Sequence, residues 1–316
     1  PQLRVGQRWY EGTADAVFHN IYLLERERPE RVLILSGDHI YKMNYGKLID
    51  FHKERGAVAT VAAIEVPRDD ARAFGVIDVD GEGRIQAFVE KPPEPPTIPG
   101  DPERSLANMG VYVFETDALV RILSADARAE SRHDFGHDIL PSLVDTGRLF
   151  AYPFVDENKK VTRYWRDIGT LDAFHAASMD LVEYEPEFNL YDPDWPIRTY
   201  PRQLPPAKFV HDDGDGRRGA AVNSVVASGT ILSGGRAERS ILHPYVRLNS
   251  YSHVTGSVLM DGVDVGRHAR VHRAIVDKGV VIPPGCVIGE DPEDDRRRFT
   301  VTDGGVCVVT RDMPLD

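Results

Sequence analysis

The chain has 316 residues, of which 41% are hydrophobic, so it is long enough to bury a sizeable core and to form two domains. Acidic residues outnumber basic ones by 50 to 38, and the net charge of −12 argues against a general nucleic-acid-binding protein, which normally has a basic face. No run approaches the roughly 18 apolar residues of a membrane span. Cys286 and Cys307 are too few for a disulfide framework and lack metal-type spacing, so a cytoplasmic protein is the simpler interpretation.

Residues 1–195 alternate helical patterns with short apolar runs. Apolar side chains recur at helical spacing through Thr13–Leu24, and Thr13 is expected to cap this helix. Compact apolar runs predict strands at Arg31–Leu35, Val58–Ile64, Ala87–Val89 and Val111–Phe114. This alternation predicts an α/β layer with a largely parallel or mixed sheet, in which ligands bind at the carboxyl ends of strands.

Two acidic residues stand at positions suited to metal binding. Asp38 follows a predicted strand in Ser36-Gly37-Asp38, and Asp167 precedes a predicted helix that opens at Thr170. Two carboxylates at the loop edge of one sheet are suitable ligands for Mg²⁺, which would offset charge on a phosphoryl group under attack. An acidic residue at a strand end is common, so Asp38 taken alone fits a structural role equally well.

The segment Glu90-Lys91-Pro92-Pro93 supplies the complementary charge. Lys91 follows an apolar strand, the prolines stiffen the exit, and a compact ammonium suits a sugar phosphate. Glu90 can accept hydrogen bonds from sugar hydroxyls, and Gly75 can allow close approach of the backbone to a ligand. The structural alternatives are a solvated Glu-Lys pair and an ordinary turn glycine.

The C-terminal part of the chain follows a different pattern. Residues 196–220 are rich in Pro, Gly and Asp and are expected to form a linker. From residue 221 onward, side chains that are mostly apolar or aromatic fall six residues apart, with small residues and glycine between them. A period of six is typical of a hexapeptide β-helix, in which one side chain per step points inward. The members of this set are Tyr245, Tyr251, Ser257, Val263, Ala269, Ile275, Val281 and Val287.

Several longer motifs occur in one order along the chain. Together they resemble the bacterial glucose-1-phosphate adenylyltransferase family over essentially the whole sequence, and the first, fourth and fifth are specific to enzymes that make ADP-glucose. The motifs are Trp9-Tyr10-Glu11-Gly12-Thr13-Ala14-Asp15-Ala16, Ser36-Gly37-Asp38-His39-Ile40-Tyr41, Phe88-Val89-Glu90-Lys91-Pro92, Tyr164-Trp165-Arg166-Asp167-Ile168-Gly169-Thr170 and Pro205-Pro206-Ala207-Lys208-Phe209.

The resemblance implies a nucleotide-diphospho-sugar transferase domain at residues 1–195, followed by a left-handed parallel β-helix at residues 221–316, usually in a homotetramer. It implies the Mg²⁺-dependent conversion of ATP and α-D-glucose 1-phosphate into ADP-glucose and diphosphate, for glycogen or starch synthesis, under the control of anionic metabolites. By position, the family's catalytic residues correspond to Asp38, Lys91 and Asp167, and the two aspartates are the metal ligands. The residues implied for sugar phosphate binding are Tyr10, Gly75, Glu90, Lys91 and Asn108, and those implied for the effector site are Arg26, Lys278 and Arg311.

Two departures from the family pattern accompany this match. Asn108 stands where the family usually has a sugar-binding serine, although its amide can still donate and accept hydrogen bonds. The glycine-rich loop that cradles the ATP triphosphate is expected before Pro1 and is not found in these 316 residues.

Three other functions compete with the adenylyltransferase. The first is an enzyme of the same fold that uses another nucleotide or sugar. The second is a non-catalytic regulatory subunit that binds effectors; the presence of Asp38, Lys91 and Asp167 favours an enzyme over this alternative. A hexapeptide acyltransferase would use one of four histidines in the repeats, but leaves residues 1–195 without a role. The tripeptide Asp134-Phe135-Gly136 imitates a kinase motif without the catalytic-loop signature of kinases.

Overall fold

A long strand, β6 (Arg104–Glu115), organises the first of the chain's two units. The computed structural model describes residues 9–155, 163–200 and 202–315, and the two units are Pro1–Arg163 and Tyr164–Asp316. On one side of β6 lies β3 (Ala59–Pro67), antiparallel to it, followed by β7 (Leu149–Pro153), which is parallel to β3. On the other side, β6 pairs antiparallel with both β1 (Arg31–Ile34) and β4 (Gly75–Val79). β5 (Ile85–Glu90) pairs in turn with β4.

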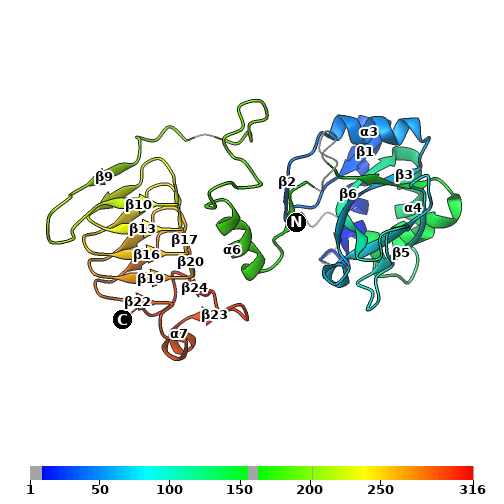
Figure 1. Ribbon diagram of the computed structural model, residues 1–316. Helices are drawn as coiled ribbons and strands as arrows, with labels where there is room; N and C mark the ends of the chain where they lie inside the picture. Colours follow the sequence, from blue (N-terminus) through cyan, green and yellow to red (C-terminus); the bar gives the residue numbers. More distant parts are fainter. Residues whose placement is uncertain (1–8, 156–162, 201, 316) are drawn as a thin grey trace. The chain divides into compact units, whose positions relative to one another are not determined.

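Helices pack on this mixed sheet (Figure 1). Leu119 and Leu123 of α4, together with Ile139 and Leu140, are almost fully buried against Phe114 of β6. Helical spacing gathers these apolar side chains on the face that meets the sheet, where each buried leucine or phenylalanine contributes about 1.5–3 kcal/mol. The short strand β2 is His39–Tyr41, and the helical elements are α1 (Thr13–Phe18), α2 (Ile21–Glu27), α3 (Tyr45–Glu54), η1 (Asp70–Ala73), α4 (Thr116–Asp126), η2 (Phe135–Ile139), α5 (Leu140–Leu143) and η3 (Val144–Thr146).

The helix predicted over Thr13–Leu24 is two helices, α1 and α2, and the prediction that Thr13 caps it is wrong. Gly12 occupies the N-cap position, with no capping hydrogen bond from a side chain. The Thr13 hydroxyl instead donates to Oδ2 of Asp134, 121 residues away, at 2.9 Å. A long-range partner has therefore replaced the local bond that the sequence pattern predicts.

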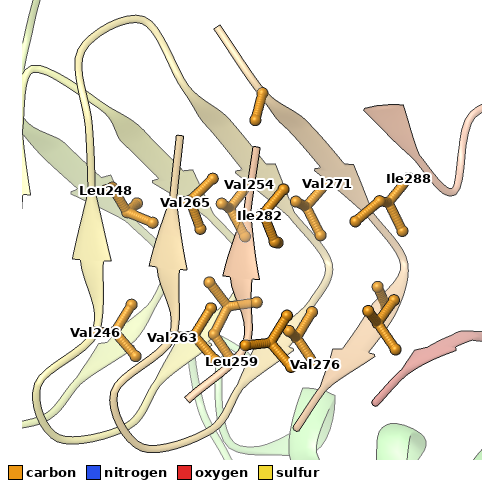
Figure 2. Close-up of a cluster of buried hydrophobic side chains, with 14 of the residues drawn as sticks. Val246, Leu248, Val254, Leu259, Val263, Val265, Val271, Val276, Ile282 and Ile288 are labelled. Carbon is orange, nitrogen blue, oxygen red and sulfur yellow. The ribbon is translucent and has the colours of Figure 1, made fainter. Parts of the chain in front are cut away.

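The second unit contains a parallel β-helix, in which successive coils stack and their strands form three sheets (Figure 1). Apolar side chains from all three sheets meet in its interior, where Leu248, Val265 and Ile282 follow one another in register (Figure 2). The strands of the β-helix are β9 (Lys208–Val210), β10 (Ala220–Val222), β11 (Val225–Val226), β12 (Ile231–Ser233), β13 (Arg236–Glu238), β14 (Ile241–Leu242), β15 (Arg247–Leu248), β16 (His253–Thr255), β17 (Val258–Leu259), β18 (Asp264–Val265), β19 (Arg270–His272), β20 (Ala274–Val276), β21 (Val281–Ile282), β22 (Val287–Ile288), β23 (Thr300–Val301) and β24 (Cys307–Val309).

The six-residue spacing read from the sequence identifies the repeat but not all of its inward positions. Residue 248 pairs with 265 and residue 265 with 282, so these coils advance by 17 residues and not by three sixes. A strict period of six therefore drifts by one residue per coil. Val263 and Ala269 are fully buried, as expected, whereas Tyr245 and Val281 are 52% and 66% exposed.

Two further features of the second unit concern its ends. The segment 196–220, predicted as a linker, contains β9, which pairs with β12 of the β-helix. The unit begins with β8 (Trp165–Asp167) and α6 (Leu171–Asp180), and α7 (Pro292–Arg298) follows the last complete coil.

Among the described residues, no helix combines the length and apolar character needed to cross a bilayer.

Candidate active site

A pocket opens in the first unit where β1 and β4 diverge along β6. β4 pairs with Leu106 and Ala107 of β6 and β1 with Tyr112–Glu115, so residues 108–111 lie between the two pairings. The pocket has a volume of about 450 Å³ and is lined by α1, the segment after β1, Glu90, the middle of β6 and the start of η2. This volume lies in the range of roughly 300–1,000 Å³ that is typical of small-molecule sites.

Glu90 projects into this pocket between two glycines that come from different elements. Gly75 opposes Glu90 in the β4–β5 pairing, and Gly136 lies in η2. A Cβ atom at Gly75 would stand 2.6 Å from Oε2 of Glu90, and a Cβ atom at Gly136 would stand 2.8 Å from the same oxygen. The sequence predicts that Gly75 allows close approach of a ligand; the close neighbour that the structure shows is the Glu90 carboxylate, which occupies the space of the missing side chains.

Lys91 follows Glu90 at the point where β5 ends. Its backbone N–H donates to the carbonyl of Phe74 at 3.0 Å. Its φ of 47° is in the left-handed region, which is uncommon for a residue other than glycine and turns the chain out of the strand. The side chain is exposed, so the ammonium is accessible to a phosphate next to Glu90.

Asn108 contributes to the pocket through two hydrogen bonds on β6. Its Oδ1 accepts from the N–H of Gly110 at 3.0 Å, and its Nδ2 donates to the hydroxyl of Tyr112 at 2.9 Å. Burial raises the pKa of Tyr112 well above its ordinary value; the bond from Asn108 opposes this shift, and the charges of Asp134 and Glu90 add to it. The pocket therefore contains a neutral hydroxyl and a held amide, both suited to sugar hydroxyls.

Asp134, which the sequence shows only as part of a chance resemblance to a kinase motif, lines the pocket. Its Oδ1 accepts from the N–H groups of Gly136 and His137, at 2.8 and 3.0 Å, and its Oδ2 accepts from the Thr13 hydroxyl. A Cβ atom added at Gly136 would stand 3.3 Å from Asp134 Oδ1 and 2.8 Å from Glu90 Oε2, so the Asp134 and Glu90 carboxylates both lie close to Gly136. An Asp that caps the start of a helix is a common local pattern, and only the fold brings this one to Glu90.

Asp38 and Tyr10, two further residues predicted for the site, do not line this pocket and make separate contacts. Asp38 is 57% exposed, its Oδ1 accepts from the Ser36 hydroxyl at 2.7 Å, and Ser36 belongs to the pocket lining. Tyr10 packs against the ring of His19, with the ring centroids 5.7 Å apart. Gly37 lines the pocket as well, so Asp38 directly follows the pocket wall, with its carboxylate accessible.

The remaining predicted residues are divided between the two units. Asp167 belongs to the second unit, where its Oδ1 accepts from the N–H of Gly169 at 2.7 Å. Lys278 and Arg311 come together there, because the Arg311 guanidinium donates to the Lys278 carbonyl. Arg26 belongs to the first unit and forms an exposed ion pair with Glu27 at 2.7 Å.

Comparison with known proteins supports both units. Residues 3–184 match the nucleotidyl transferase family, and residues 205–309 match the GlmU-like C-terminal hexapeptide family. The chain is 51% identical over 317 residues to a glucose-1-phosphate adenylyltransferase of Koribacter versatilis, covering 100% of this chain and 76% of the relative. It is 51% identical over 315 residues to that of Rhodopirellula baltica, covering 98% and 71%, and 50% identical over 312 residues to that of Methylococcus capsulatus, covering 98% and 73%.

The chain belongs to the glucose-1-phosphate adenylyltransferase family. The resemblance read from the sequence motifs is confirmed, and so is the order of a nucleotidyltransferase domain before a hexapeptide domain. In this member of the family, the pocket around Glu90 is the concave site of the first unit that collects most of the predicted sugar residues: Glu90 and Asn108 line it, Gly75 backs Glu90, and Lys91 follows Glu90 in the chain.

The close approach at Gly75 yields a testable prediction for this adenylyltransferase family member. Gly75→Ala places a methyl group 2.6 Å from Oε2 of Glu90 and 2.9 Å from Cζ of Phe88, so the carboxylate has to move. Overpacking of this kind costs about 1–3 kcal/mol, and we expect KM for glucose 1-phosphate to rise roughly 5- to 100-fold while KM for ATP stays nearly unchanged. Gly81→Ala is the matched control, because a Cβ atom there meets nothing within 4 Å. Equal effects of the two substitutions would contradict the role of Gly75.

Proposed function

We propose that the protein catalyses the reaction of ATP with α-D-glucose 1-phosphate to give ADP-glucose and diphosphate, supplying ADP-glucose for glycogen or another α-glucan. The observation that supports this most strongly is the Glu90 carboxylate, held between Gly75 and Gly136 in a pocket of about 450 Å³ and followed directly by the exposed Lys91. A half-buried hydrogen-bond acceptor beside an accessible ammonium suits a ligand that has hydroxyls at one end and a phosphate at the other. The family membership adds the identity of the sugar phosphate and the nucleotide.

In the proposed mechanism, a phosphate oxygen of glucose 1-phosphate attacks the α-phosphorus of ATP in line. The new P–O bond forms as the bond to the β-phosphate oxygen breaks, and diphosphate leaves without a covalent enzyme intermediate. Lys91 holds the attacking phosphate, while Glu90, Asn108 and Tyr112 orient the glucose ring. The protein's contribution is therefore positioning and charge complementarity.

We assign Asp38 and Asp167 to Mg²⁺ on the chemistry of their side chains. Each carboxylate has one oxygen engaged by a neighbouring donor, Ser36 for Asp38 and Gly169 for Asp167. Among the described residues no group of three or more His, Cys, Asp or Glu side chains is arranged to hold a metal. Mg²⁺ is commonly bound by one or two carboxylates together with substrate phosphates. When bound, the ion would offset charge on the α-phosphate and the leaving diphosphate.

The test of this function is the choice of nucleotide. Diphosphate release is measured with glucose 1-phosphate and ATP, UTP or dTTP, each with and without Mg²⁺, and we expect Mg²⁺-dependent turnover with ATP to exceed the others at least about tenfold. A preference for UTP or dTTP would assign a different nucleotidyltransferase activity. Binding of effectors without turnover on any nucleotide would indicate a regulatory subunit.

We also propose that Lys278 and Arg311, together with Arg26, bind an anionic metabolite that regulates a homotetramer. The contact between Arg311 and the Lys278 carbonyl brings two of these three cations together on the β-helix unit. Because that contact uses the backbone of Lys278, a change of its side chain leaves the contact in place.

Lys278→Gln is therefore expected to reduce activation while leaving the rate without activator nearly unchanged. Allosteric coupling is typically 1–3 kcal/mol, so the ratio of activated to basal rate is expected to fall about fivefold or more, measured over a titration with sugar phosphates and nucleotides. Arg296→Gln, an exposed cation of α7, is the control. Equal loss of basal and activated rates would indicate misfolding instead.

A further inference from the structure

Asp167 is closely tied to the first turn of α6. Only Ile168, Gly169 and Thr170 separate it from Leu171, where the helix begins. The N–H of Gly169 donates to Asp167, and the hydroxyl of Thr170 accepts from the N–H of Ala173 at 3.1 Å. The position of the Asp167 carboxylate in its unit therefore depends on where the first turn of α6 lies.

Within the second unit, α6 and the residues after it are fastened to the β-helix at several points. The ring of His175 is hydrogen bonded through Nε2 to the carbonyl of Gly256 at 2.7 Å, and Glu183, beyond the helix, pairs with Arg239 at 2.7 Å. Phe174 and Met179 pack on a small apolar cluster shared with the β-helix: Val182, Ile241 and Val258. These contacts hold the body and the end of the helix.

The first turn of α6 has a separate fastening, made by Asp172. Its Oδ1 accepts from the hydroxyl of Thr302 at 2.6 Å, and its Oδ2 accepts from the N–H of Gly304 at 3.2 Å. Thr302 and Gly304 lie in the turn that joins β23 and β24, which pair antiparallel. The Thr302 hydroxyl also accepts from the N–H of Val306 at 3.0 Å, so the turn that receives Asp172 is itself closed.

The close fit of Asp172 to this turn depends on Gly304. A Cβ atom at residue 304 would stand 2.5 Å from Oδ1 of Asp172. The other side of the turn is held as well, because the Arg273 guanidinium donates to the Gly304 carbonyl at 2.9 Å. A carboxylate that takes a hydroxyl and a backbone N–H at a glycine is a directed contact, stronger than an exposed surface pair.

We propose that Asp172 is a positioning residue: its two hydrogen bonds to the β23–β24 turn set the first turn of α6 and thereby the placement of the Asp167 carboxylate that binds Mg²⁺. This inference rests on the metal role assigned to Asp167 in the proposed function. The β-helix would in this way take a direct part in placing a catalytic group. The sugar pocket around Glu90 belongs to the other unit and does not depend on this contact.

Two substitutions test the proposal in the full protein. Thr302→Val removes the hydroxyl donor and nearly keeps the shape of the side chain, and Asp172→Asn replaces one acceptor oxygen with a donor group. For both we expect the Mg²⁺ concentration for half-maximal diphosphate release to rise roughly tenfold, with KM for glucose 1-phosphate within about twofold of the original. Hydrogen exchange at the amides of Gly169 and of the first turn of α6 is expected to become about tenfold faster.

Arg239→Ala is the matched control, because it removes the ion pair to Glu183, which lies beyond the end of α6. It should leave the Mg²⁺ dependence and the exchange at Gly169 unchanged. The proposal is overturned if the Asp172 and Thr302 variants lose thermal stability but keep the original Mg²⁺ dependence and the original hydrogen exchange at Gly169. Such a result would mean that the substitutions affect only packing. If the unaltered protein makes no ADP-glucose, the proposed function fails, but hydrogen exchange still decides whether Asp172 holds the Asp167 segment.

Discussion

Asp38→Asn is expected to lower kcat by about 100-fold or more, with smaller changes in KM for both substrates. A neutral amide is a poor ligand for Mg²⁺, and the ion's effect on the transferred phosphoryl group is worth several kcal/mol. The local loop should survive the change, because the asparagine oxygen can still accept the hydrogen bond from Ser36 that Asp38 Oδ1 accepts at 2.7 Å. The loss would therefore reflect the missing charge and not a rearranged backbone.

The experiment measures initial rates of diphosphate release at several Mg²⁺ concentrations. Asp50→Asn is a suitable control, because Asp50 is an exposed acid of α3 whose partner is Lys53 at 3.8 Å. A high Mg²⁺ concentration should recover only part of the kcat of the Asp38 variant. Near-normal kcat at moderate Mg²⁺ would remove Asp38 from the metal site.

Lys91→Ala is expected to raise KM for glucose 1-phosphate roughly 10- to 150-fold, because it removes one charge-assisted contact to the phosphate, worth about 1.5–3 kcal/mol. KM for ATP should change far less. The fold should survive the change, because the side chain is exposed and alanine is no more strained than lysine at a φ of 47°. The backbone bond from residue 91 to the Phe74 carbonyl is retained in the variant.

Lys53→Ala, on the exposed face of α3, provides the control for the loss of one positive charge. Lys91→Arg adds a second comparison, since it keeps the charge but replaces a compact ammonium with a planar guanidinium and should recover part of the affinity. If KM for ATP rose steeply while that for glucose 1-phosphate barely moved, Lys91 would belong to the nucleotide site.

Some parts of the fold and site could be predicted because they depend on short stretches of sequence. A helix opens at Thr170 as expected, and its hydroxyl caps α6, a bond that joins residues three apart in the chain. Compact apolar runs identified β1 and β3 and the end of β6, and the repeat of small and apolar residues identified the β-helix. Glu90 and Lys91 could be recognised as candidates because they follow a strand within a short motif.

Tertiary structure alone decided which residues meet. Asp134 accepts a hydrogen bond from Thr13, which is 121 residues away in the chain and also lines the pocket. The Glu90 carboxylate lies between glycines of β4 and η2. The 17-residue coil, which exposes Tyr245 and Val281, follows from how successive coils align their strands. α6 directly follows a motif that resembles one of the adenylyltransferase family, yet it belongs to the β-helix unit, because Asp172 and His175 find partners more than 80 residues further on. The sequence by itself therefore determined the kinds of element and the chemical groups that they carry, while strand register and long-range hydrogen bonds decided how those groups are brought together, because such contacts join residues that no local pattern connects.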